Sequence, residues 1–438
     1  MKKSLIVLSL IASANAFAGS IDYLAQQDAE YFAHPSMIGK VGVSGAYYNP
    51  AGTVFLDDGL YVQLNSQTLF KNYEMETVMN GTGKLSHESD HPSLFVPSLQ
   101  LVKKDGDRSY FFHAGAAAGG GKVKYENGIS AFEVIGALIP GAEYLNGNTV
   151  EGSSYYFNTT FGMAQKINSK FSVAAGARVM YVTRELSGTG NYSLATGKET
   201  IGTPYERIPV KVDIDSERTG WGVGGVVGFN YQPTKKLNIG FKYETEVHLN
   251  LDADGELKVS SPVQKATDKF DPALNQIHGI LSQQSVISEW LVDGNRNLPA
   301  MMALGLSYEL TDRITLLTSG NYYFIKNANT DNPYDHYDNG YEISFGVDYK
   351  LNDKWTLMAG YQYTDTGANE NTYKDTDYAL DADMYGMGVK YTPDETKEFL
   401  ISYAYVDYKN GTAVKNGMKT TTFKKQVDAI ALSATFKF

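Results

Sequence analysis

The chain has 438 residues, a net charge of −11 and no cysteine. The acidic balance argues against nucleic acid as a partner, because phosphate binding requires a basic face. The absence of cysteine excludes disulfides, thiolate metal sites and cysteine nucleophiles. Tyr (32) and Gly (43) are abundant and the mean hydropathy is −0.30. This composition favours a membrane β-barrel over a bundle of membrane helices. Lipid-facing and lumen-facing residues alternate along barrel strands, so the mean hydropathy of a barrel stays low.

The N-terminus has the pattern of an export signal. Met1-Lys2-Lys3 is basic, and the residues from Ser4 to Ala12 are apolar. Small residues follow, so we expect a signal peptide over residues 1–18 that is cleaved after Ala18. An anchored membrane helix fits less well, because polar sequence follows at once.

Residues 19–58 lack the period of two that marks strands. We expect a short helix within residues 21–32, ended by His34-Pro35. A segment of this length without strand character cannot lie in lipid, because its backbone groups would be unsatisfied there. It must therefore lie in the periplasm or inside the barrel.

From Gly59 onward, apolar and polar residues alternate. In residues 341–351 the odd positions are apolar and most even positions are polar, and the pattern resumes after a short turn at Trp355. Such a hairpin has one face for lipid and one wet face. About 14 strands are predicted at 59–72, 93–104, 108–124, 152–167, 169–186, 217–232, 236–250, 300–311, 313–326, 340–351, 353–366, 382–392, 397–409 and 425–438.

The connectors between these strands alternate in length. Short turns such as residues 104–107 and 352–354 alternate with long loops such as residues 251–299. Short periplasmic turns and long external loops are typical of outer-membrane barrels, and an even strand count leaves both chain ends on the periplasmic side. The chain ends on alternating apolar residues and Phe438, which resembles the signal that outer-membrane assembly machinery reads. We therefore predict an all-β transmembrane antiparallel barrel at residues 59–438, in the outer membrane of a Gram-negative-type bacterium.

No constellation of catalytic residues is present. The seven histidines show no ligand spacing of the HExxH kind, and Gly119-Gly120-Gly121 lacks the Lys-Ser/Thr of a phosphate loop. We expect no enzyme activity, no metal and no cofactor.

The third predicted strand contains a run of small residues, from Ala114-Gly115 to Gly119-Gly120-Gly121. Glycine weakens a strand ladder and permits a bulge or kink, and a kink would open a gap in the barrel wall. The alternative is an ordinary strand of small residues that faces a crowded plug.

Two of the long loops are apolar. In loop 251–299 the spacing predicts a helix over residues 272–291, beginning at Pro272. The candidate substrate-binding residues of this helix are Leu274, Ile277, Ile280, Leu281 and Trp290. Residues 131–140 are similarly apolar. An exposed apolar helix requires a surface to bury against, so the two loops indicate either a hydrophobic substrate or packing between loops.

The sequence resembles the FadL/TodX family of outer-membrane transporters for long-chain fatty acids and other hydrophobic compounds. The most specific similarity is Asn49-Pro50-Ala51-Gly52, shortly before the first strand. Val96-Pro97-Ser98, Trp221-Gly222-Val223-Gly224 and Asn297-Leu298-Pro299-Ala300 also resemble the family. The resemblance spans essentially the whole mature chain.

This resemblance implies a 14-strand barrel whose lumen is plugged by an N-terminal hatch, here residues 19–58. It implies that Asn49-Pro50-Ala51-Gly52 packs at a kink in the third strand, here residues 114–121. Substrate would land on the extracellular loops and leave sideways into the lipid of the outer membrane. It also favours a monomer.

Arg178 and Arg184 face the lumen in the register of the fifth predicted strand. Either could pair with a fatty-acid head group, or with a lumen carboxylate such as Glu244 or Glu246. Two other functions remain open from the sequence: a general diffusion porin with an open lumen, and a surface adhesin or receptor that binds through its loops.

Overall fold

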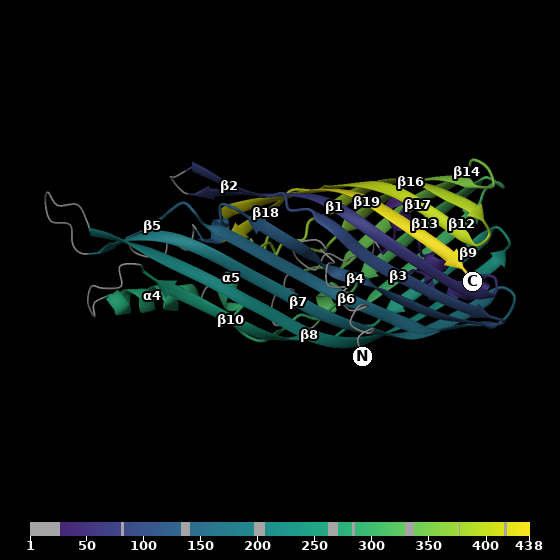
Figure 1. Cartoon of the computed structure of the whole chain (residues 1–438), viewed down its shortest axis with the longest axis horizontal. Coiled ribbons are helices and arrows are strands. Elements are labelled where there is room, and N and C mark those ends of the chain that lie inside the picture. Colours follow the sequence, from purple (N-terminus) through teal and green to yellow (C-terminus); the bar gives the residue numbers. More distant parts are fainter. Residues whose placement is uncertain are drawn as a thin grey trace.

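The computed structural model describes residues 27–79, 83–132, 141–196, 206–261, 270–282, 285–328, 337–375, 377–415 and 418–438. A closed antiparallel β-barrel of 14 strands forms the body of the molecule (Figure 1). It closes where the first strand pairs with the last, from Tyr61 opposite Lys437 to Thr77 opposite Thr421. Closure removes every edge from the wall, as a lipid-embedded sheet requires.

The wall strands agree closely with the predicted ones. They are β1 (Gly59–Met79), β3 (Ser93–Asp105), β4 (Arg108–Tyr125), β6 (Thr149–Lys166), β7 (Phe171–Thr196), β8 (Glu206–Thr234), β9 (Leu237–Glu244), β12 (Met301–Glu309), β13 (Ile314–Tyr323), β14 (Gly340–Lys350), β15 (Trp355–Asp365), β16 (Ala382–Asp394), β17 (Lys397–Tyr408) and β19 (Met418–Lys437). Alternate side chains point outward, so apolar residues such as Leu304, Phe345 and Ile401 remain exposed on the lipid-facing surface.

Two wall strands are much longer than predicted. β7 and β8 pair without interruption from Phe171 opposite Tyr231 to Thr196 opposite Glu206. Figure 1 shows this hairpin projecting beyond the other wall strands, on the side opposite the C-terminus. The sequence did not predict the extra length of β7 and β8, because the polar residues among positions 187–216 are equally compatible with an exposed loop and with a strand in solvent.

Shorter elements are added to the outer end. They are β2 (Gly83–Ser89), β5 (Ala142–Tyr144), β10 (Asn250–Ser260), β11 (Gly294–Asn295), β18 (Gly411–Lys415), and the helices α4 (Phe270–Ser282) and α5 (Ser285–Ser288). α4 begins two residues before the predicted start at Pro272, and α5 lies within the predicted helical region. β10 pairs with β8, and α4 packs against β10. Among the described residues, no helix has the length and apolar character to cross a membrane.

The seventh predicted strand, residues 236–250, ends early. β9 stops at Glu244, after which the chain turns inward and Val247 bridges to Leu298. Val247 and Leu249 are fully buried against the position where Gly222 of β8 lacks a side chain. The absence of a Cβ on Gly222 makes room for this inward segment. The alternation of residues in β9 could not predict this, because it depends on a contact with another strand.

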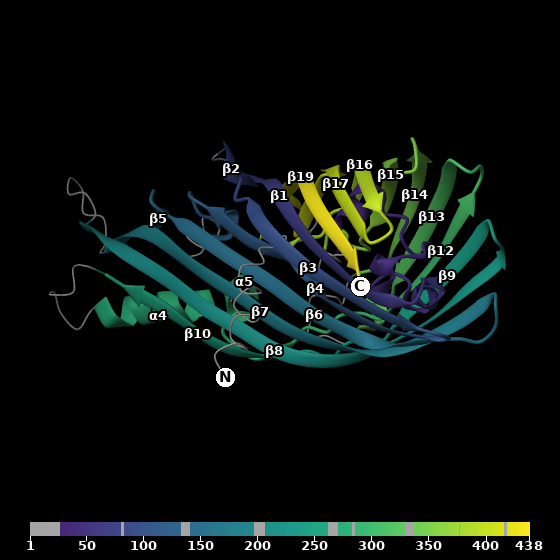
Figure 2. The same cartoon turned by 45° about the vertical axis from the view of Figure 1, so that its right-hand side comes forward.

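Residues 27–58 lie inside the barrel. They form the helix α2 (Ala29–Ala33) and the 3-10 turns η1 (Val43–Ala46) and η2 (Pro50–Phe55). α2 contacts β16, β17 and β19, whereas η2 contacts β6, β7 and β8, so the segment spans the lumen (Figure 2). The predicted signal peptide and residues 19–26 lie outside the described residues.

Candidate functional site

The inside of the barrel contains two hollows that border the same irregular stretch of β4. Ala117 lines the inner hollow, between residues 27–58 and the wall, and Gly121 lines the outer hollow, beneath the extracellular elements. The residues from Ala116 to Gly121 are all buried, so this stretch of β4 is withdrawn from the lipid-facing surface.

Glycine is the reason that β4 is irregular. Its pairing with β6 shifts twice, between Ala116 and Ala118 and between Ala118 and Gly121. Gly119 and Gly121 have φ values of +98° and +66°, which residues with a side chain rarely adopt. A Cβ on Gly119 would also collide with the carbonyl oxygen of Ser154. The predicted irregularity is therefore present in this strand.

The pairing of β4 with its other neighbour stops at the same place. β3 and β4 pair from Asp105 opposite Arg108 to Leu99 opposite Ala114. Within the described chain, β3 has no further ladder partner on β4 for Ser93–Ser98, although it stays paired with β1 as far as Ser93. The strand ladder of the wall is thus interrupted between β3 and β4.

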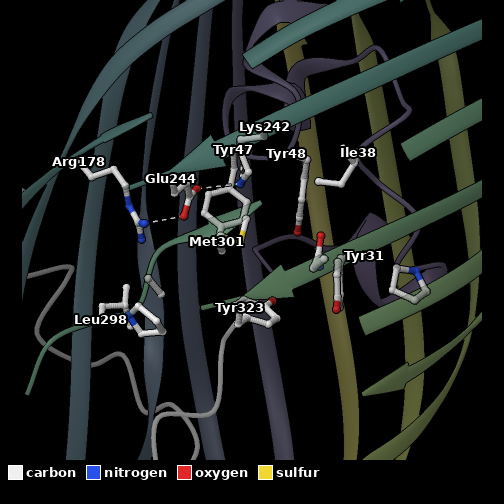
Figure 3. Close-up of a pocket in the computed structure, with 14 residues that line it drawn as sticks. Tyr31, Ile38, Tyr47, Tyr48, Arg178, Lys242, Glu244, Leu298, Met301 and Tyr323 are labelled. Carbon is white, nitrogen blue, oxygen red and sulfur yellow. Dashed lines mark hydrogen bonds and ion pairs between the residues drawn. The ribbon is translucent and has the colours of Figure 1, made fainter. Parts of the chain in front are cut away.

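The inner hollow lies between residues 27–58 and the barrel wall. Figure 3 shows residues of the N-terminal segment on one side and wall residues on the other. Its lining combines aromatic and aliphatic side chains with a few charged groups: Tyr31, Pro35, Ile38, Tyr47, Tyr48, Ala117, Arg178, Lys242, Glu244, Leu298, Pro299, Met301, Asn321 and Tyr323. A mostly apolar pocket with a few fixed polar groups is typical of a small-molecule site.

Arg178, a candidate head-group residue, already has a partner. Its Nη1 atom lies 2.6 Å from Glu244 Oε2, and Lys242 Nζ lies 2.9 Å from Glu244 Oε1 (Figure 3). All three side chains are buried. The lumen-carboxylate alternative therefore holds for Arg178, which shares Glu244 with Lys242.

The outer hollow is lined by the second candidate, Arg184. Its guanidinium carbon lies 4.6 Å from the centre of the Trp290 ring, which is also part of the lining. The other lining residues are mainly apolar or aromatic: Tyr73, Gly121, Val123, Tyr125, Ile129, Val150, Gly152, Ser153, Ser154, Glu185, Leu186, Arg296, Asp375 and Tyr378.

Buried positive charge is in excess around the outer hollow. Arg184, Arg218 and Arg296 are each about 5% exposed, but the one buried carboxylate among them, Asp377, pairs with Arg296. In the part of the chain that the structure describes, neither Arg184 nor Arg218 has a carboxylate at ion-pair distance. Burial alone would raise the pKa of Asp377, but Arg296 and Arg184 hold it below its ordinary value.

The remaining carboxylates near the outer hollow face solvent or have other hydrogen-bond or ion-pair partners. Glu185 is exposed to solvent. Asp375 accepts a hydrogen bond from the backbone of Ala131, and Glu289 pairs with Lys374 at 3.0 Å. The hollow therefore combines apolar and aromatic lining residues with Arg184, which has no carboxylate at ion-pair distance among the described residues.

The candidate residues on the loop helix have mixed positions. Ile277 and Leu281 are buried in the cluster that joins α4 to the extended sheet, and Leu274 packs against it. Ile280 is half-buried. None of these four lines either hollow, whereas Trp290 does. Packing between loops therefore accounts for α4, and residues 133–140 of the other apolar loop lie outside the described chain.

Asn49-Pro50-Ala51-Gly52 does not pack at the irregular stretch of β4, contrary to expectation. The Asn49 amide donates to Asn230 Oδ1 at 2.7 Å and accepts from the backbone of Gly52 at 3.1 Å. The carbonyl of Ala51 accepts from Ser172 at 2.6 Å. These contacts bind η2 to β7 and β8. Gln27 instead forms a hydrogen bond to the irregular stretch of β4, through its side-chain amide.

A buried ion network holds α2 to the opposite wall. Glu30 pairs with Lys40 and with Lys390, and Asp348 pairs with Lys40 and contacts His34. Burial alone would raise the pKa of Glu30, but Lys390 and Lys40 lower it to about 2. Glu30, His34 and Asp348 have the donor atoms of a metal site, but the two lysines already neutralise the carboxylates.

Several residues of the two hollows escaped the sequence analysis. Arg218 lies directly opposite Arg184, and the same alternation that placed Arg184 in the lumen could have found it. Tyr47 and Tyr48 directly precede Asn49, but their aperiodic segment carried no signal of what they contact. Gln27 had no signal for the same reason.

The comparisons with known proteins agree with this architecture. The model of the family described as "Outer membrane protein transport protein (OMPP1/FadL/TodX)" matches residues 5–438. Outer membrane protein P1 of Haemophilus influenzae is 23% identical over 347 residues, which are 74% of this chain and 68% of that protein.

Solved structures show the same fold at low sequence identity. A Pseudomonas aeruginosa FadL homologue has a TM-score of 0.68 at 16% identity, covering 96% of this chain and 100% of that one. The toluene transporter TodX of P. putida has a TM-score of 0.66 at 13% identity, covering 95% and 99%. The toluene transporter TbuX of Ralstonia pickettii has a TM-score of 0.57 at 16% identity, covering 93% and 98%.

Proposed function

The chain belongs to the OMPP1/FadL/TodX family of outer-membrane transport proteins, and on this premise we propose that it carries long-chain fatty acids across the outer membrane. Transport is facilitated diffusion: no ATP or ion gradient drives it. The single observation that carries the choice of substrate is the excess of buried arginine beside an apolar hollow.

Arginine is suited to this head group. Its planar guanidinium presents paired N–H donors that match a carboxylate, and it keeps its charge when buried. Arg184 and Arg296 line the outer hollow together with Trp290 and Leu186. A fatty acid satisfies both features, since its carboxylate neutralises arginine and its chain buries apolar area at about 25 cal/mol per Å².

The path that we propose runs from the outer hollow to the inner hollow and then through the wall. Both hollows border β4, at Gly121 and Ala117. The interrupted ladder between β3 and β4 supports a sideways exit there, since no strand hydrogen bonds need to break. Leu94 and Phe95 of β3 are exposed beside the interruption, so the substrate meets an apolar rim and then lipid.

Uptake by cells that lack their own outer-membrane fatty-acid transporter tests this function. We expect the intact chain to restore uptake of labelled oleate, with labelled methyl oleate and toluene entering more slowly. Deletion of Asn49-Pro50-Ala51 at matched surface expression should abolish uptake, because it unfastens η2 from β7 and β8.

The other outcomes assign a different function. Uptake of toluene without oleate would indicate an uncharged substrate, as the names of TodX and TbuX state for those proteins. High ion conductance of the intact chain in planar bilayers would indicate a diffusion porin. A folded barrel that neither imports these compounds nor conducts ions would favour an adhesin or receptor.

A further inference from the structure

We propose that Gln27 is the gate of the opening between β3 and β4, that Tyr48 couples this gate to the inner hollow, and that its opening limits the rate of transport. The proposal rests on the sideways exit proposed above and adds the residues that control it.

The interruption between β3 and β4 is a bounded window. Its periplasmic border is the last ladder pair, Leu99 opposite Ala114. At its outer border β4 is held to β2 and β1 instead of β3. The backbone N–H of Lys124 donates to Ser89 Oγ of β2 at 3.0 Å, and Lys71 Nζ of β1 donates to the carbonyl of Lys122 at 2.8 Å. Contacts at both borders keep the strands together, so the opening is confined to the stretch from Gly115 to Gly121.

Gln27 bridges this window from inside. Its side-chain Nε2 donates to the carbonyl oxygen of Ala116 on β4 at 2.6 Å, and its backbone carbonyl accepts from Ser98 Oγ on β3. The residue is 1% exposed. A Cβ on Gly115 would lie 2.7 Å from Gln27 Oε1, so glycine at this position gives the glutamine its space.

These bonds replace the missing ladder. A buried backbone carbonyl requires a hydrogen-bond partner, and the amide of Gln27 supplies one to Ala116 where β3 does not. The replacement belongs to the segment inside the barrel and not to the wall. It can therefore withdraw without breaking a strand, which is the property that a gate requires.

Tyr48 connects Gln27 to the inner hollow. Its hydroxyl accepts a hydrogen bond from the backbone N–H of Gln27 at 2.8 Å. Its ring lines the inner hollow and stacks on Tyr31, with ring centres 6.0 Å apart (Figure 3). An apolar chain entering the hollow packs against these rings and displaces that of Tyr48. The hydroxyl then leaves Gln27, which frees the window.

The first test compares uptake kinetics of full-length variants at matched surface expression. Gln27→Ala removes the bond to Ala116, and Tyr48→Phe removes one hydroxyl while keeping the ring. Each should raise the maximal rate of oleate uptake about fivefold, the factor for one neutral hydrogen bond, at an unchanged half-saturating concentration. The control is Ser36→Ala, which removes a buried hydrogen bond from the same segment to Ser344 on β14, and it should leave the rate unchanged.

The second test does not depend on transport. The chain has no cysteine, so Gln27→Cys introduces a single thiol whose labelling by a maleimide reports access to the window. Labelling should accelerate at least twofold with oleate, and also without oleate in the Tyr48→Phe background. Ser36→Cys should label slowly in every case.

The outcomes separate the gate from the transport function. If the intact chain imports oleate but Gln27→Ala and Tyr48→Phe behave like Ser36→Ala, the gate is wrong and the function stands. If the intact chain fails to import oleate, the function is wrong. The gate is then supported or overturned by whether Tyr48→Phe alone accelerates labelling at position 27.

Discussion

Arg184 on β7 and Arg218 on β8 lie directly opposite each other in the ladder, and both side chains are almost fully buried. Like charges facing each other across two strands destabilise a sheet. The inner hollow is different, because Glu244 contacts both Arg178 and Lys242. Each inner cation thus has a carboxylate partner, whereas among the described residues neither arginine of the outer pair has one at ion-pair distance.

Arg184→Gln should weaken oleate binding and raise the thermal stability of the barrel without ligand. Loss of a charge-assisted hydrogen bond costs about 1.5–3 kcal/mol, so the half-saturating concentration of oleate should rise at least tenfold. Uptake of methyl oleate should be unaffected. The unfolding temperature without ligand should rise, because the repulsion with Arg218 is removed.

The matched control is Arg207→Gln, which removes an arginine from the projecting end of β8 that pairs with Glu143 at 3.0 Å. It should leave the uptake of both compounds unchanged. Equal losses for oleate and methyl oleate in Arg184→Gln would contradict a head-group role.

Gly119→Ala should abolish transport while the barrel still assembles. The positive φ at this residue costs a side chain about 1–2 kcal/mol, and the new Cβ collides with the Ser154 carbonyl. β4 must then shift, which deforms the window and both hollows. Oleate uptake and heat-modifiable mobility on gels measure the two effects. The control is Gly279→Ala on α4, where the added Cβ has no neighbour within 4 Å, and it should retain full uptake. Normal uptake by Gly119→Ala would show that transport does not require the irregular backbone of β4.

The segment inside the barrel should loosen as the pH rises from about 4 to 6. Asp28 caps α2 by accepting from the backbone of Tyr31 at 3.0 Å, and burial, followed by Glu30, raises its pKa to about 6. The folded state therefore binds this proton more tightly than the unfolded state, and the stabilisation present at low pH is lost as the group ionises. The loss amounts to roughly 3 kcal/mol of local stability.

Hydrogen exchange of the α2 amides at pH 4 and pH 7.5, corrected for intrinsic rates, measures most of this change. Protection should fall at the higher pH in the natural chain and remain constant in Asp28→Asn, which keeps the cap. Glu30 does not interfere, because its lowered pKa of about 2 places its titration below this range. An identical pH response in the two proteins would count against Asp28.

Asn49→Ala should release η2 from the wall. It removes both the cap on Gly52 and the bond to Asn230, at a cost of about 1–3 kcal/mol. Ion conductance in planar bilayers should rise, because the segment then opens more often. Asn49→Ser, which keeps a cap acceptor, should have an intermediate conductance. Asn371→Ala, in an exposed loop, should have the conductance of the natural chain. If Asn49→Ala also has that conductance, the hydrogen bonds of Asn49 do not hold η2 in place.

The wall strands could be read from the sequence because alternation is a local property. A strand with one face in lipid must place an apolar side chain at every second position, as residues 341–351 do. The irregularity of β4 was also readable, since the glycines at 119 and 121 permit backbone angles that other residues avoid.

Only the tertiary structure decided which residues meet across the lumen. Arg178 has a carboxylate partner and, among the described residues, Arg184 faces an arginine instead. This depends on Glu244 and Arg218, which lie 66 and 34 residues further along the chain. The contacts of Gln27 with Ser98 and Ala116 are of the same kind. An aperiodic segment has no repeating pattern that specifies its partners, so its position is set by the shape and hydrogen-bonding groups of the wall that encloses it.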